Sequence, residues 1–216
     1  MIGEFSKVAA SAVLLRRKRR ASTFREGPRI IVIGGQCRGV GKTAMMVDVI
    51  RAFPNCDWLA LKITQHHTDE RDCSPYVFWA EADGTRDSDT SRFIAAGAAR
   101  AFLLRVRPGH FRDAVPELGA LAGAAENVII EGNTVLEYLT LTLTIFVLDP
   151  RRADFKRSAR RLLPLADAFV FRSAFQSRRW PGIDPGMITF KPHFLQPIGG
   201  PLPVSVCRAV SRALGK

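Results

Sequence analysis

Short apolar runs alternate with amphipathic segments along most of the chain. The runs, several of them rich in β-branched residues, predict buried strands at residues 30–33, 58–64, 76–82, 100–106, 127–130, 143–148, 168–171 and 187–190. Apolar positions spaced three and four residues apart predict helices at 42–53, 90–99, 112–125, 154–166 and 204–214. This alternation is typical of an α/β fold, in which helices cover both faces of a mostly parallel sheet.

The turn between the first strand and the first helix has the composition of a phosphate-binding loop. Glycines allow backbone N–H groups to turn toward a phosphate, and a helix N-terminus adds unpaired donors. We expect Lys42 to reach the terminal phosphates of a nucleotide and the Thr43 hydroxyl to bind Mg²⁺. The full set of expected nucleotide contacts in this turn is Gly35, Gly39, Val40, Gly41, Lys42, Thr43 and Ala44.

The spacing of this loop is one residue longer than the common G-x4-G-K-[ST] form. Gly35 and Gly41 enclose five residues, which gives the deviant Walker A pattern G-x5-G-K-T and predicts a P-loop NTPase fold. The pattern resembles the loops of ParA-like ATPases and dethiobiotin synthetases. ParA-like loops carry an extra lysine early in the loop, and here Arg38 either replaces it or is solvated. Cys37 is interpreted as a small loop filler rather than as a reactive thiol of low pKa.

Two charged residues lie at or near the ends of predicted strands. Lys62 lies within the strand 58–64, and Glu131 directly follows the strand 127–130. Ligands of open α/β sheets bind beyond the carboxyl ends of the strands, so we expect Lys62 to contact phosphate or substrate. Glu131 is in the Walker B position, which supports Mg²⁺ or its water. The alternative is that Lys62 and Glu131 form a structural ion pair.

Asp89 and His66 are further candidates for the same site. Asp89 precedes a predicted helix that Thr90 or Ser91 would cap, so it either stabilises the helix N-terminus or supports the metal. His66 is a candidate nucleotide contact, although adjacent loop histidines such as His66 and His67 are usually solvated. Lys42 and Glu131 are the candidate catalytic residues. Because no general base is evident, we expect at most slow NTP hydrolysis or a nucleotide-dependent transferase or ligase reaction.

Composition and charge add information about domains and partners. The chain has 216 residues, 47% of them hydrophobic, and a formal net charge of +12, which favours polyanionic partners such as nucleotides, nucleic acid or anionic lipid. Residues 1–27 hold seven basic and two acidic side chains. This segment is expected to be a flexible tail, either solvated or in contact with an anionic surface, and residues 28–216 a single nucleotide-binding domain.

The four cysteines and the apolar runs bear on cellular location. The cysteines are far apart and form no C-x-x-C pair, which argues against a zinc site or a disulfide scaffold. No apolar run reaches the length that spans a membrane; the run at 8–15 is followed, not preceded, by basic residues, unlike a signal peptide. These features favour a cytoplasmic protein.

Four short motifs, in order from residue 29 to residue 132, resemble the molybdopterin-guanine dinucleotide biosynthesis protein B family, a GTP-binding P-loop group. The first is the glycine loop. The second, residues 62–66, is similar to the family's K-H-T-H-H segment. The third, Asp89-Thr90 followed by residues 96–99, is similar to the family's D-S-x5-A-G-A-A segment. The fourth, residues 130–132, is similar to the family's V-E-G segment. The resemblance implies GTP with Mg²⁺, a role in molybdenum cofactor biosynthesis, and a molybdopterin-binding or nucleotidyltransferase partner protein. We also expect a homodimer.

Two other classes share part of this pattern. Dethiobiotin-synthetase-like enzymes and small-molecule kinases, which use ATP, share G-x5-G-K-T, a lysine at the end of the second strand and E-G after a strand. They usually have K-P after the second strand, where this chain has Lys62-Ile63. They also usually have E-G-A-G-G, where residues 131–133 of this chain read E-G-N. A ParA-like switch ATPase that binds DNA or membrane through its basic tail is the second alternative.

Overall fold

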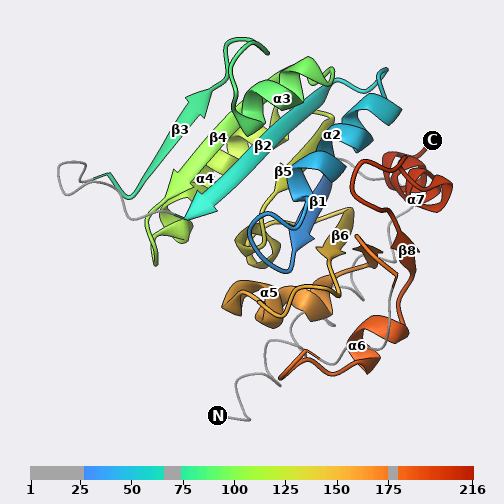
Figure 1. Ribbon diagram of the computed structural model, residues 1–216. Coiled ribbons are helices and arrows are strands. Elements are labelled where there is room, and N and C mark those ends of the chain that lie inside the picture. Colours follow the sequence, from blue (N-terminus) through green and yellow to red (C-terminus); the bar gives the residue numbers. More distant parts are fainter. Residues whose placement is uncertain (1–26, 66–73, 175–179) are drawn as a thin grey trace.

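A computed structural model describes residues 27–65, 74–174 and 180–216 of the chain. The basic tail and His66 therefore lie outside the described residues. One eight-stranded sheet runs through the molecule in the order β3-β4-β2-β5-β1-β6-β7-β8 (Figure 1). All neighbouring strands are parallel except β3, which pairs antiparallel with β4. The strands are β1 Arg29–Gly35, β2 Trp58–Gln65, β3 Tyr76–Ala80, β4 Arg100–Val106, β5 Asn127–Glu131, β6 Leu143–Leu148, β7 Ala168–Phe171 and β8 His193–Leu195.

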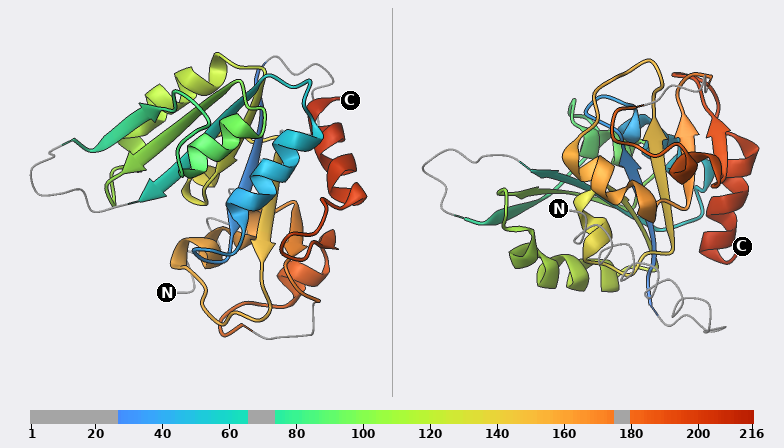
Figure 2. Two further views of the ribbon diagram at one scale, coloured as in Figure 1. Left: turned by 45° about the horizontal axis from the view of Figure 1, so that its top comes forward. Right: turned by 90° about the horizontal axis from the view of Figure 1, so that it is seen from below.

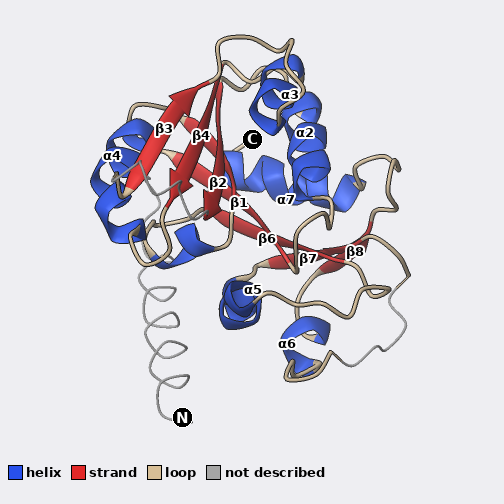
Figure 3. Cartoon of the chain, turned by 60° about the vertical axis from the view of Figure 1, so that its left-hand side comes forward, coloured by secondary structure: helices blue, strands red, loops and turns tan. Residues whose placement is uncertain are grey.

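Helices cover both faces of this sheet, as the alternating pattern predicts. The α-helices are α2 Lys42–Ala52, α3 Asp89–Ala95, α4 Phe111–Gly123, α5 Arg157–Leu162, α6 Gly186–Thr189 and α7 Val204–Leu214, and two 3-10 turns are η1 Thr134–Glu137 and η2 Leu163–Leu165. Figure 3 shows α2 and α3 together on one face and α4 on the other. The C-terminal helix α7 lies beside α2 (Figure 2).

Two hydrophobic clusters, one on each face, hold these layers together. Side chains of a strand point alternately to opposite faces, and β1 shows this directly. Ile31 and Ile33 pack with α2, α3 and α7, whereas Ile30 and Val32 pack with α4 and α5. Because β1 is buried on both faces, its sequence reads as a continuous apolar run. Within the described residues, no helix combines the length and apolar character needed to cross a membrane.

The prediction of a strand at 187–190 is wrong. These residues belong to α6 and its end, and the edge strand of the sheet is β8, three residues further on. Backbone bonds close the helical turn, because the N–H of Thr189 donates to the carbonyl of Pro185 at 3.0 Å. A short apolar run has no period that separates strand from helix. Within this run Ile188 is buried and Phe190 is 91% exposed.

The predicted bounds of two helices also need correction. The helix α3 begins at Asp89 and is capped by Ser88, whose hydroxyl accepts from the N–H of Ser91 at 3.0 Å, so neither Thr90 nor Ser91 is the cap. It ends before Gly97, which has a φ of +109°, a conformation that glycine adopts readily. The segment 154–166 is only partly α-helical, as α5, and continues as the 3-10 turn η2, which contains Pro164.

Candidate functional site

The loop between β1 and α2 needs glycine at the positions that define its pattern. Gly39 and Gly41 have φ angles of +71° and +97°, which disfavour any residue with a Cβ. A Cβ at Gly35 would lie 2.8 Å from Cγ of Lys42, so this glycine makes room for the aliphatic stem of the lysine. A Cβ at Gly41 would lie 2.7 Å from Nε of Arg172. The loop is therefore fixed by close contacts on both sides.

Two side chains that sequence reasoning missed hold the two ends of this loop. Asn133 accepts from the N–H of Gly35 at 2.9 Å and donates to its carbonyl at 3.0 Å. Arg172 donates through Nη2 to the carbonyl of Gly41 at 2.5 Å. Each residue lies just beyond a buried strand, Asn133 two residues after β5 and Arg172 directly after β7. Position after a parallel strand, which singled out Glu131, is the signal that could have found them.

The third missed residue is Gln36, which stands where the shorter loop pattern has its first glycine. Its side chain is fully buried. The amide donates to the carbonyls of Arg152 and Asp154 at 3.0 and 2.8 Å, and its oxygen accepts from the N–H of Asp149 at 2.9 Å. All the side-chain hydrogen bonds of Gln36 thus connect the loop to the segment after β6, which accounts for a polar residue at this buried position.

Lys42 and Cys37 face each other across the loop. Nζ of Lys42 donates to the carbonyl of Cys37 at 2.9 Å. Burial lowers the pKa of Lys42, and the Glu131 carboxylate acts in the opposite direction. Burial and a hydrogen bond to Asp154 raise the pKa of the Cys37 thiol to about 11. A buried thiol of high pKa is unreactive, which agrees with the role of loop filler. Arg38, the next residue, is exposed.

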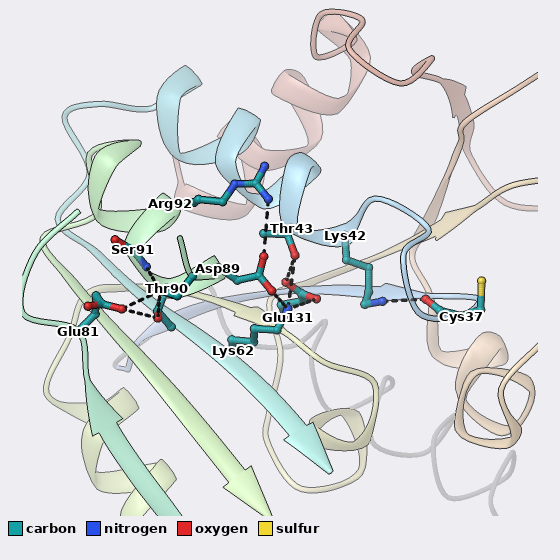
Figure 4. A network of polar contacts seen from close by, with 11 residues as sticks. Cys37, Lys42, Thr43, Lys62, Glu81, Asp89, Thr90, Ser91, Arg92 and Glu131 are labelled. Carbon is teal, nitrogen blue, oxygen red and sulfur yellow. Dashed lines mark hydrogen bonds and ion pairs between the residues drawn. The ribbon is translucent and has the colours of Figure 1, made fainter. Parts of the chain in front are cut away.

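The predicted metal and phosphate residues come together beside this loop (Figure 4). Lys62 and Glu131 are direct neighbours in the register of β2 and β5. Nζ of Lys62 lies 3.1 Å from Oε1 of Glu131 and also forms an ion pair with Oδ2 of Asp89. The cluster of Thr43, Lys62, Asp89 and Glu131 is called the carboxylate cluster below. The ion pair considered above therefore exists, and it includes Asp89 as a second carboxylate.

The hydroxyl of Thr43 completes the carboxylate cluster. It donates to Oε2 of Glu131 at 2.7 Å and accepts from Nζ of Lys62 at 3.4 Å. Among the described residues there is no group of three or more His, Cys, Asp or Glu side chains that could hold a metal ion by itself. Mg²⁺ is usually bound through one or two carboxylates together with phosphates and water. A threonine hydroxyl beside two carboxylates, next to a phosphate-binding loop, fits that donor set.

An open cleft of about 850 Å³ connects these groups. The glycines of the loop, Ala44 and the carboxylate cluster all line it, whereas the Val40 side chain belongs to the hydrophobic core. Two lining side chains are acidic, Asp89 and Glu131, and six are cationic: Arg38, Lys42, Lys62, Arg92, Lys156 and Arg157. This excess of positive charge suits a polyanion that enters from solvent.

The strand order, the glycine loop and the Lys-Thr pair at the start of α2 together make this a P-loop NTPase fold. No protein-family model matches the chain, and no curated protein matches its sequence.

Several solved structures are similar to the chain at low sequence identity. LpxK from Aquifex aeolicus, solved with ATP, has 16% identity and a TM-score of 0.47 over 88% of this chain, which spans 61% of the LpxK chain. HypB from Helicobacter pylori, solved with nickel, has 17% identity and a TM-score of 0.48 over 98% of this chain and 92% of its own. HypB from Archaeoglobus fulgidus has 12% identity and a TM-score of 0.49 over 98% of both chains. Likenesses this remote carry no argument about what the chain binds.

Proposed function

We propose that the protein binds a nucleoside triphosphate with Mg²⁺ in the cleft beside the β1–α2 loop. The observation that carries this proposal is the convergence of a phosphate-binding loop and the carboxylate cluster on one cationic cleft. Lys42 and the backbone N–H groups at the start of α2 would bind the phosphates. Thr43, Glu131 and Asp89 would hold Mg²⁺, which neutralises phosphate charge when bound.

The nucleotide that we propose is GTP, and the process is the attachment of the nucleotide to molybdopterin in molybdenum cofactor biosynthesis. Support for this finer assignment comes from the four motifs that resemble the family described above. Three of the motifs contribute the three charged residues of the carboxylate cluster: 62–66 gives Lys62, the Asp89-Thr90 pair gives Asp89, and 130–132 gives Glu131. A partner that carries molybdopterin or transfers the nucleotide would then dock beside the cleft, and the protein would act as a homodimer.

The test is a calorimetric binding panel with GTP, GDP, ATP and ADP, each with and without Mg²⁺. We expect GTP to bind at least ten times more tightly than ATP, and Mg²⁺ to strengthen the binding of the triphosphate more than that of the diphosphate. No binding of any nucleotide at millimolar concentration would contradict the whole proposal. Equal binding of GTP and ATP would contradict only the guanine assignment.

A second candidate is an ATP-dependent enzyme of the dethiobiotin-synthetase or small-molecule kinase kind. The observation in its favour is that the side chains of Lys156 and Arg157, exposed cations of the same cleft, make no hydrogen bond or ion pair with any described residue. They are available for an anionic acceptor substrate next to the triphosphate. In the binding panel this candidate requires ATP to bind more tightly than GTP. In that case, a screen of small carboxylate or phosphate acceptors for ATP-dependent turnover would follow.

A further inference from the structure

The ammonium group of Lys62 lies among the same three oxygen-bearing side chains that are proposed to bind Mg²⁺. Nζ contacts Glu131 at 3.1 Å and Thr43 at 3.4 Å, and it is paired with Asp89. A lysine ammonium has three donors and no acceptor, and here each partner is an oxygen on a different element, namely β5, α2 and α3. A monovalent cation from the chain itself thus holds the centre of the carboxylate cluster.

The surroundings of this contact make it more than a surface ion pair. The Lys62 side chain is 18% exposed and the Glu131 side chain 7%, so the pair is largely shielded from water. Lys62 and Glu131 are fixed as neighbours by the strand register. Glu131 is also oriented by the Thr43 hydroxyl. The oxygens are therefore already gathered around a cation before any ligand is bound.

We propose that Lys62 is a built-in placeholder for the divalent cation, and that the metal binds only when Nζ leaves this position. Mg²⁺ binds oxygen at about 2.0–2.1 Å, so the metal and Nζ cannot both occupy the space among the same oxygens. Their like charges also repel. The inference rests on the proposed binding of Mg²⁺ and nucleotide, and it adds that Lys62 must move before the metal binds.

The displaced ammonium needs a new anionic partner, and the cleft provides a place for one. Lys62, Lys42 and Thr43 line the same cleft, so a phosphate bound at the loop lies within the space that the Lys62 side chain can reach. Nucleotide then supplies the partner that Lys62 needs, while the freed oxygens accept the metal. Metal and nucleotide consequently bind together, and the metal alone binds weakly.

Binding of Mn²⁺ without nucleotide tests this proposal. Free Mn²⁺ is quantified by its electron paramagnetic resonance signal during titration of the parent protein and of Lys62→Met. We expect Lys62→Met to bind Mn²⁺ at least ten times more tightly than the parent, because its carboxylates are no longer neutralised. The double variant Lys62→Met/Asp89→Asn should lose most of this gain. Lys62→Gln is measured in parallel, with circular dichroism to verify folding of each variant.

The matched control is Lys156→Met, which removes a cation from the same cleft but touches neither carboxylate of the cluster. Its Mn²⁺ affinity should stay within threefold of the parent. Equal affinities of the parent and both Lys62 variants would overturn the proposal, as would a gain that survives in the double variant or is matched by Lys156→Met. The assay contains no nucleotide, so its failure is distinct from a failure of the nucleotide panel, which tests the proposed function itself.

Discussion

Replacement of Arg172 by methionine tests whether the end of β7 holds the phosphate-binding loop. Arg172 is 4% exposed. Besides the bond to Gly41, its Nη1 donates to the side-chain oxygen of Gln196 at 2.9 Å, and Gln196 in turn donates to Asp48 of α2 at 2.7 Å. These contacts therefore connect the ends of β7 and β8 to the β1–α2 loop and to the helix α2.

The expected cost follows from the groups that the substitution leaves behind. In Arg172→Met, the side-chain oxygen of Gln196 loses its donor, and a buried unpaired acceptor costs about 1–3 kcal/mol. The carbonyl of Gly41 loses one of its two donors and keeps the N–H of Met45 at 3.0 Å. Relief from burying the guanidinium offsets part of this. Burial lowers the pKa of Arg172, and its Nε has no hydrogen-bond partner among the described residues. We expect a net loss of roughly 1–3 kcal/mol, which lowers the melting temperature by roughly 2–12 °C at this chain length.

Urea unfolding and thermal melts of the nucleotide-free protein measure this loss. Arg172→Lys should recover little of it, because an ammonium cannot reproduce the two-pronged guanidinium geometry. Arg38→Met, an exposed arginine on the loop itself, is the control and should change stability by no more than about 0.5 kcal/mol. If Arg172→Met melts within 2 °C of the parent, the contacts of Arg172 do not hold the loop.

Two further predictions concern the loop itself. Gly41→Ala should destabilise the protein by roughly 1–3 kcal/mol and weaken nucleotide binding, because φ is +97° and the new Cβ would lie 2.7 Å from Nε of Arg172. The control is Gly119→Ala within α4, where no heavy atom lies within 4 Å of the added Cβ. It should be neutral or stabilising in the same thermal melt. Because the pKa of the Cys37 thiol is raised to about 11, folding favours the neutral thiol. The resulting contribution to the stability of the folded state is complete below the unfolded pKa of about 8.5 and is lost as pH rises through 11. Denaturant unfolding at pH 8 and pH 10.5 should therefore show a smaller loss of stability for Cys37→Ala than for the parent, and identical losses would count against the raised pKa.

The apolar runs predict several strands to the residue. The observed bounds of β4, β6 and β7, and those of the helix α7, coincide with the predicted ranges. The failure at 187–190 has a local cause, because Pro185 begins a helical turn that a run of four residues cannot reveal.

For the site, strand-end reasoning singles out Lys62 and Glu131, and the structure brings them together. It does not reveal Arg172 or Asn133 as partners of the loop. These contacts join residues 131 and 98 positions apart in sequence, and they depend on the order of β5, β1, β6 and β7 in the sheet. The local sequence pattern carries no information about that order. Polar residues after strands can therefore be recognised as candidates, but the residues they contact cannot be predicted.

Binding of Mg²⁺-nucleotide to Lys42→Ala, measured by calorimetry beside the parent, tests the central claim most directly. The Lys42 side chain lines the cleft and its ammonium group donates to the carbonyl of Cys37, so its loss removes no contact of the hydrophobic core. We expect the variant to melt within about 3 °C of the parent, a change on the order of 1 kcal/mol. Its affinity should fall roughly 10- to 100-fold, as for the loss of a charge-assisted hydrogen bond. Equal affinity of the variant and the parent would contradict nucleotide binding at this loop.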